Sequence, residues 1–197
     1  MSAERPIVRL DRDDIVRGLR ELVSELGRTG SSARIRLVGG AAIALAYNAA
    51  RGSTVDLDAE LTPETTILEA AHHVAVAFTW QEDWLNSAAV HFLPSGFGER
   101  TAEWSVLHEQ NGIVVEVATA ETLLAMKLFA CQRRRRRELP DLRVLLPLCG
   151  IATIDDAEKH LGMYYPGEEF TLAAAAVVQA ALDDPAIPQT AEPPVLA

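Results

Sequence analysis

The sequence predicts an α+β protein, with a mixed sheet in its first part and a helical lobe after it. Segments of alternating polarity and segments of helical apolar spacing follow one another, and Asn111-Gly112 separates two of the alternating segments. Asn-Gly is the preferred pair of a type I′ turn, so these two segments are expected to form a hairpin. Beyond Thr119, apolar residues recur at helical spacing. The expected domains are a sheet lobe, a helical lobe and a flexible tail, at 1–120, 121–185 and 186–197.

Local sequence features justify each element in turn. Asp11 or Asp13 can cap the first helix, and Pro63 suits the first turn of a later one. Thr119 can cap a long helix that stops before Pro140. The expected strands are 34–38, 54–61, 88–93, 104–109 and 113–118. The expected helices are 11–27, 41–50, 63–78, 119–137, 141–149, 153–162 and 168–182.

Composition and charge limit the class of protein. The 197 residues are 49% hydrophobic, which argues against a disordered chain. The first residues lack the apolar segment of a signal peptide, and no apolar run is long enough to span a membrane. Cys131 and Cys149 show no metal-ligand spacing. We therefore expect a soluble cytoplasmic protein with no membrane partner.

The charge is unevenly distributed along the chain. A net charge of −10 disfavours general binding to nucleic acid, yet residues 133–137 are five consecutive arginines. Such a basic patch can hold a polyanion at one place. It can equally be a solvated helix face with acidic partners such as Glu138, and the sequence leaves both interpretations open.

Two short motifs carry the chemistry. Gly39-Gly40 closes a strand-like run and opens a helix-like one, so its backbone N–H groups at a helix N-terminus suit a phosphate group. Asp56 and Asp58, two residues apart in an expected strand, project to the same face. Two adjacent carboxylates favour a cation such as Mg²⁺, which takes oxygen ligands. Together the motifs indicate phosphoryl or nucleotidyl transfer; turn glycines beside a solvated strand end are the alternative.

Several further residues are candidates for the same chemistry. Lys127 lies in an apolar helical stretch, so its ammonium needs a carboxylate or phosphate partner unless the side chain extends to solvent. Glu138 and Asp141 follow at offsets that place them on the same helix face as Lys127. Glu116 lies in an expected strand among apolar neighbours. Three interpretations are open for it: a third metal carboxylate, a base, or a charge on an edge strand. Arg51 and Thr54 precede the aspartates and are placed to contact phosphates.

The motif order resembles that of minimal nucleotidyltransferases of the polymerase-β superfamily, and within them the AbiEii-like and MenT-type toxins of toxin–antitoxin systems. The resemblance covers about residues 35–145. It rests on VGG, the Arg-x-x-Thr-x-Asp-x-Asp motif that begins at Arg51, and Lys127-x-x-Ala-x-x-x-Arg134 with Asp141 beyond. Many relatives have Gly-Ser where this chain has Gly40-Ala41, so the serine hydroxyl that would contact phosphate is absent.

The resemblance implies a polymerase-β-like core and a Mg²⁺-dependent toxin that moves a nucleoside monophosphate from an NTP, with CTP favoured, to the 3′ end of tRNA. Catalytic roles would fall to Asp56, Asp58, Lys127 and Asp141. The nucleotide would contact Gly39, Gly40, Arg51, Thr54 and Lys127. The tRNA would contact Arg133, Arg134, Arg135, Arg136 and Arg137.

The resemblance also implies a cognate antitoxin. Phosphorylation of Ser53 or Thr54 beside the carboxylates would be one means of control. The alternatives are a nucleotidyltransferase that modifies a protein hydroxyl or a small molecule, and a catalytically silent partner-binding domain.

Overall fold

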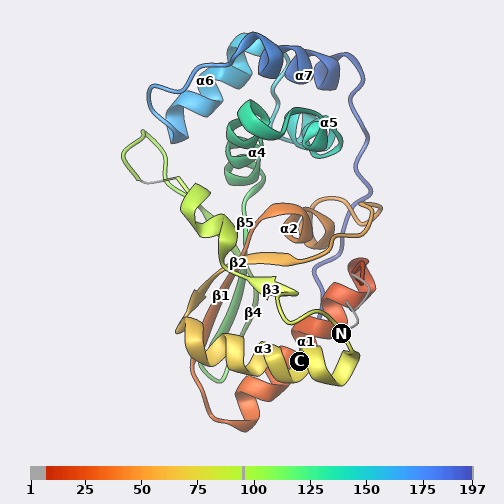
Figure 1. Cartoon of the computed structure of the whole chain (residues 1–197). Helices are drawn as coiled ribbons and strands as arrows, with labels where there is room; N and C mark the ends of the chain where they lie inside the picture. Colours follow the sequence, from red (N-terminus) through yellow and green to blue (C-terminus); the bar gives the residue numbers. More distant parts are fainter. Residues whose placement is uncertain (1–7, 95, 197) are drawn as a thin grey trace, which may run out of the picture. The chain divides into compact units, whose positions relative to one another are not determined.

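The computed structural model describes residues 8–94 and 96–196, apart from the side chains of Arg134 and Arg135. Within them it contains a five-stranded mixed sheet and seven α-helices, which confirms the predicted α+β class (Figure 1). No helix of this described part has both the length and the apolar character needed to cross a membrane.

The chain forms two compact units. The sheet unit comprises Met1–Val90, Ser105–Val117 and Ala191–Ala197, and the helical unit comprises His91–Trp104 and Ala118–Thr190. The division near residue 118 is close to the expected boundary at 120. Segment 91–104 belongs to the helical unit rather than to the expected sheet lobe, and segment 191–197 belongs to the sheet unit rather than to a separate tail. Both differ from expectation because their contacts are with residues distant in sequence.

The sheet unit is built on β1 (Ala33–Leu37), which lies at the centre of the strand order β3-β2-β1-β5-β4. β1 pairs antiparallel with β2 (Leu57–Thr62) and parallel with β5 (Ile113–Ala118). β3 (Leu85–Asn86) pairs parallel with β2. β4 (Trp104–Gln110) lies beside β5 at the other edge.

The two faces of the sheet differ in chemistry. One face carries buried aliphatic side chains, namely Ile35, Leu37, Leu57, Ala59, Ile113, Val115 and Val117. A Cβ atom at Gly27 would lie 4.0 Å from Ile113, so α1 (Arg12–Arg28) covers this face. α3 (Glu64–Phe78) lies beside α1 (Figure 1). The opposite face carries Arg34, Arg36, Asp58, Glu60 and Glu116, because paired residues project to the same side.

Several local predictions are confirmed. Asp11 caps α1 in a reciprocal capping box with Asp14. Asn111 and Gly112 have φ angles of 52° and 77°, as a type I′ turn between β4 and β5 requires. The Thr119 hydroxyl accepts a hydrogen bond from the Thr122 N–H at 3.4 Å, at the start of α4 (Ala120–Arg134).

Two strand predictions are wrong in detail. The apolar segment predicted as strand 88–93 is a 3-10 helix, η1 (Ala88–Phe92), and the strand before it, β3, has only two residues. β2 begins at Leu57 rather than at Thr54, which instead forms an isolated bridge with Leu10. α2 (Gly39–Ala46) ends before the predicted residue 50.

The helical unit packs four α-helices around an apolar core. α4 passes into a short 3-10 turn, η2 (Arg135–Arg137), and α5 begins beyond it at Leu139. The predicted helix 119–137 therefore changes its winding at Arg135. The remaining helices are α5 (Leu139–Leu148), α6 (Ile154–Tyr164) and α7 (Leu172–Asp183).

The segment after α7 does not behave as an isolated tail over its full length. Leu196 is only 2% exposed in the sheet unit. Arg12 and Arg20 of α1 donate hydrogen bonds to the Glu192 and Val195 carbonyl oxygens, each at 2.6 Å. Residues 191–196 are thus held on α1.

Candidate functional site

The Gly-Gly turn and the second aspartate meet at one end of the sheet. Because β1 and β2 are antiparallel, the end of β1 lies beside the start of β2, and the Val38 N–H donates to the Asp58 carbonyl oxygen at 2.9 Å. Gly39 has a φ of 67°, and a Cβ atom there would lie 3.0 Å from Asp58 Oδ2. Both the backbone angle and the close approach therefore favour glycine at this position.

Gly40 is constrained by a cation. A Cβ atom at Gly40 would overlap the guanidinium group of Arg51, which lies directly over this glycine. Arg51 also donates to the Gly52 carbonyl oxygen at 3.3 Å. The structure thus brings three predicted elements together at the first turn of α2: the Gly-Gly pair, Asp58 and Arg51.

Asp56 lies at the same end, immediately before β2. Asn86 of β3 is the register partner of Asp58, so its side chain projects from the Asp58 face. The Asn86 Nδ2 atom donates to Asp56 Oδ2 at 3.3 Å. This contact places Asp56 on the predicted side of the sheet, although the strand itself starts one residue later.

Glu116 occupies a different environment on the same face. It lies on β5, an interior strand, so the edge-strand alternative is wrong. Its Oε2 atom accepts hydrogen bonds from Arg34 at 2.8 Å and from Arg36 at 2.9 Å, and Arg36 also contacts Glu60 at 3.0 Å. Burial raises the pKa of Glu116, but the hydrogen bonds and charges of the two arginines outweigh burial and hold the pKa below its ordinary value.

The donor set fits a magnesium ion held by two carboxylates rather than three. Within the described residues, no three His, Cys, Asp or Glu side chains are grouped so that they could hold a metal ion. Mg²⁺ is commonly held by one or two carboxylates, with waters and substrate phosphates completing the shell. Asp56 and Asp58 would supply such a pair, next to backbone that favours glycine.

Ser53 and Thr54 lie in the connection that precedes β2. The Ser53 hydroxyl accepts from Arg9 Nε at 2.9 Å, and the Thr54 hydroxyl donates to the Asp56 carbonyl oxygen at 3.1 Å. Thr54 is outside β2 and does not share the strand alternation of Asp58, contrary to expectation. Its side chain supports the Asp56 backbone, and phosphorylation at either residue stays a prediction.

In the helical unit, Lys127 meets the partners that its apolar surroundings demand. Its Nζ atom lies 2.7 Å from Glu138 Oε2 and 2.9 Å from Asp141 Oδ2. The side chains of Lys127, Glu138 and Asp141 are 15%, 4% and 6% exposed. The three residues are in contact but do not share one helix face. α4 ends at Arg134, and the chain turns through η2 and Glu138, so Asp141 reaches the lysine from α5.

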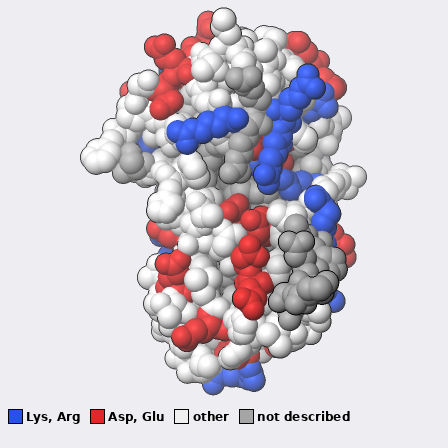
Figure 2. Space-filling view, viewed as in Figure 1, with Lys and Arg blue, Asp and Glu red and all other residues white. Residues whose placement is uncertain are grey.

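The arginine run is described only in part. Arg133, Arg136 and Arg137 are exposed, whereas the side chains of Arg134 and Arg135 lie outside the described residues. The Arg133 guanidinium lies 5.9 Å from the centre of the Phe129 ring, which stacks on Tyr165 at 4.5 Å. Figure 2 shows extended basic side chains over the helical unit and a column of acidic ones over the sheet unit.

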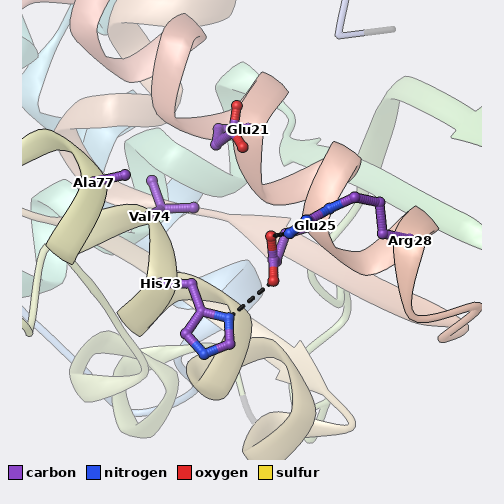
Figure 3. A pocket seen from close by; sticks show the side chains of 6 residues that line it. All are labelled: Glu21, Glu25, Arg28, His73, Val74 and Ala77. Atoms are coloured by element: carbon purple, nitrogen blue, oxygen red, sulfur yellow. Dashed lines mark hydrogen bonds and ion pairs between the residues drawn. The ribbon is translucent and has the colours of Figure 1, made fainter.

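A separate pocket of about 270 Å³ lies between α1 and α3. Glu25, which is 8% exposed, accepts a hydrogen bond from His73 Nδ1 at 2.8 Å and another from Arg28. Figure 3 shows the His73 ring directed at Glu25. The pocket lies in the helix layer that covers the apolar face, and Asp56 and Asp58 are not among its lining residues. The hydrogen bond between His73 and Glu25 joins the two helices.

Asn86 is not among the residues predicted from the sequence. A lone asparagine after a buried Trp-Leu pair carries no recognisable motif, and only the β2–β3 register reveals it. Glu138 was found by its helical offset without an assigned role. Comparisons of this chain with protein-family models, with curated proteins and with solved structures give no match.

Proposed function

We propose that the protein is a Mg²⁺-dependent nucleotidyltransferase that transfers a nucleoside monophosphate from an NTP to the 3′ end of tRNA in the cytoplasm. The observation that carries this proposal is the approach of Asp58 to Gly39, beside the first turn of α2. Carboxylates for a cation and N–H donors for phosphate then lie at one end of the sheet.

The residues of the sheet unit would act on the nucleotide. The Gly39 and Gly40 N–H groups would donate to phosphate oxygens, and Arg51 would add positive charge beside them. Asp56 and Asp58 would hold the ion. When bound, Mg²⁺ would polarise the α-phosphate and stabilise the in-line displacement. The 3′-hydroxyl would release its proton to solvent as its oxygen forms a bond to the α-phosphorus. The bond from that phosphorus to the bridging oxygen would break, and pyrophosphate would leave with the electron pair of that bond.

The helical unit would supply cations for phosphate groups. Lys127 is already oriented by Glu138 and Asp141, and we assign its ammonium to an anionic phosphate of the nucleotide. Arg133, Arg136 and Arg137 are exposed and are assigned to the tRNA backbone. Blocking the tRNA 3′ end would stop aminoacylation, so the protein would act as a toxin restrained by an antitoxin.

The deciding experiment incubates the purified protein with total tRNA, Mg²⁺ and each α-labelled NTP in turn. We expect label to enter tRNA, best from CTP, and to be lost with EDTA or in Asp56→Ala. Label on a protein or a small aminoalcohol instead of tRNA would keep the chemistry and replace the acceptor. Equal labelling of tRNA by Asp56→Ala would refute the assignment.

The tRNA assignment has its own test. Replacement of Arg133, Arg136 and Arg137 by Gln should weaken tRNA binding and reduce the log–log salt slope by about 0.7–0.9 for each lost contact. Arg28→Gln, an exposed arginine of the sheet unit, is the control and should leave the slope unchanged. An unchanged tRNA affinity with weakened NTP binding would move these arginines to the nucleotide.

A further inference from the structure

Asn86 is the one residue of the β3 strand end that reaches a candidate metal ligand. Its Nδ2 atom lies 3.3 Å from Asp56 Oδ2 and 3.4 Å from the Asp83 carbonyl oxygen. Its Oδ1 atom accepts a hydrogen bond from the Ala88 N–H at 2.9 Å. One amide group thus joins β3, the loop before it and η1 to Asp56.

The chemistry of these contacts fixes the orientation of the amide. The Ala88 N–H only donates, so the side-chain atom that faces it must be the oxygen. The amide nitrogen then faces Asp56, whose ionised carboxylate only accepts. A flipped amide would place two donors together at Ala88 and two acceptors together at Asp56.

A neutral donor is suited to a carboxylate that must bind a cation. On the same sheet face, Glu116 receives two guanidinium groups, whose positive charges compensate its own. An amide donates one hydrogen bond and adds no charge. Asn86 therefore restricts the rotation of the Asp56 carboxylate without placing a positive charge beside it.

We propose that Asn86 is a positioning residue that holds Asp56 in the orientation needed to bind a divalent cation. This inference rests on the proposed function, since it assumes that Asp56 is a metal ligand. Outer-shell partners of metal ligands typically contribute 10–100-fold to metal affinity. We expect a loss of that size when the Asn86 donor is removed.

The test measures Mn²⁺ affinity by electron paramagnetic resonance, together with the thermal unfolding midpoint. Asn86→Ser is the informative variant, because a serine hydroxyl can still accept from the N–H two residues on but is too short to reach Asp56. We expect Mn²⁺ to bind about tenfold more weakly, with little change in the midpoint. Ser87→Ala is the matched control, since Ser87 contacts Glu64 instead, and should bind Mn²⁺ like the wild type.

Asp56→Asn separates the two assignments. If Asp56→Asn weakens Mn²⁺ binding and Asn86→Ser does not, the role of Asn86 is overturned while the metal site stands. If Asp56→Asn binds Mn²⁺ like the wild type, the proposed function fails first. Because Asn86 acts through Asp56, the double variant should bind no more weakly than Asp56→Asn alone. An additional tenfold loss in the double variant would contradict the positioning role.

Discussion

Asp58 in the sheet unit and Asp141 in the helical unit are chemically identical side chains in opposite surroundings. Asp58 is half-buried, at the end of a sheet face, against the bare backbone of Gly39. The Asp141 side chain is 6% exposed and lies 2.9 Å from the Lys127 ammonium. The first is partly exposed to solvent, whereas the second is enclosed by the protein. Under the proposed function Asp58 would serve the reaction, whereas Asp141 holds a cation of the protein itself.

The largest expected effect is on activity at the open site. Asp58→Asn keeps the shape of the side chain and removes its charge, so nucleotide incorporation should fall by about 1,000-fold, equivalent to about 4 kcal/mol of transition-state stabilisation. The free energy of unfolding should change by less than about 1 kcal/mol. Parallel assays of tRNA labelling and chemical denaturation check both. A variant that unfolds easily would show that Asp58 supports the fold.

The enclosed cluster should behave in the opposite way. Lys127→Met leaves two buried carboxylates without their cation and should lower the free energy of unfolding by about 3–5 kcal/mol. Asp141→Asn keeps the Lys127–Glu138 contact and should cost less, about 2 kcal/mol. Urea denaturation of the three proteins measures this order. Stability equal to the wild type in Lys127→Met would contradict the buried ion-pair assignment.

A smaller effect, which depends on pH, is expected on the sheet face. The pKa of Glu116 is held below its ordinary value of 4.5, since its hydrogen bonds with Arg36 and Arg34 outweigh the effect of burial. A lowered folded-state pKa stabilises the fold above the unfolded-state pKa, and this contribution is lost as the pH falls through the folded value. Glu116→Gln should therefore lower the free energy of unfolding by about 1–2 kcal/mol at pH 7. The expected loss is small because both arginines are partly exposed to solvent, which screens their charges.

The difference between Glu116→Gln and the wild type should shrink as the pH falls below about 4.5. Unfolding curves at pH 7, 5 and 3.5 measure this trend. A difference that stays constant over this range would show that the carboxylate charge is not what stabilises the arginines.

The smallest effect concerns a thiol of the helical unit. Burial, with a further contribution from the Glu121 charge, raises the pKa of Cys149 to about 12. The thiolate is the reactive form, so iodoacetamide should label the native protein slowly at pH 8 and quickly once it is denatured. Mass spectrometry after timed quenching measures both rates. Fast labelling of native Cys149 would contradict its burial.

What could be predicted from the sequence was local. The Asn111-Gly112 turn and the caps at Asp11 and Thr119 follow from backbone preferences of the residues themselves. The Gly-Gly pair and the two aspartates could be recognised because their order and their spacing can be read directly from the sequence. The structure adds that Gly39 and Asp58 touch.

What could not be predicted depended on pairing between distant segments. The run Ala88–Phe92 is apolar enough to suggest a strand, but Asn86 caps it as a 3-10 turn instead. Glu116 was left open as a metal ligand, and only the register of β5 with β1 shows that it faces Arg36. Residues 91–104 join the helical unit through contacts such as the Arg100 N–H with the Met163 carbonyl oxygen at 3.0 Å.

The packing of residues 191–196 on α1 has a consequence for the order of folding during synthesis. Every residue of the helical unit precedes Ala191, whereas the sheet unit requires Leu196 to fill its surface beside α1. Domains usually complete themselves from the N-terminus as the chain emerges. In this protein the sheet unit contains both the first and the last segments of the chain. All residues of the helical unit are therefore synthesised before the last segment of the sheet unit, so a nascent chain passes through a stage with a complete helical unit and an incomplete sheet unit.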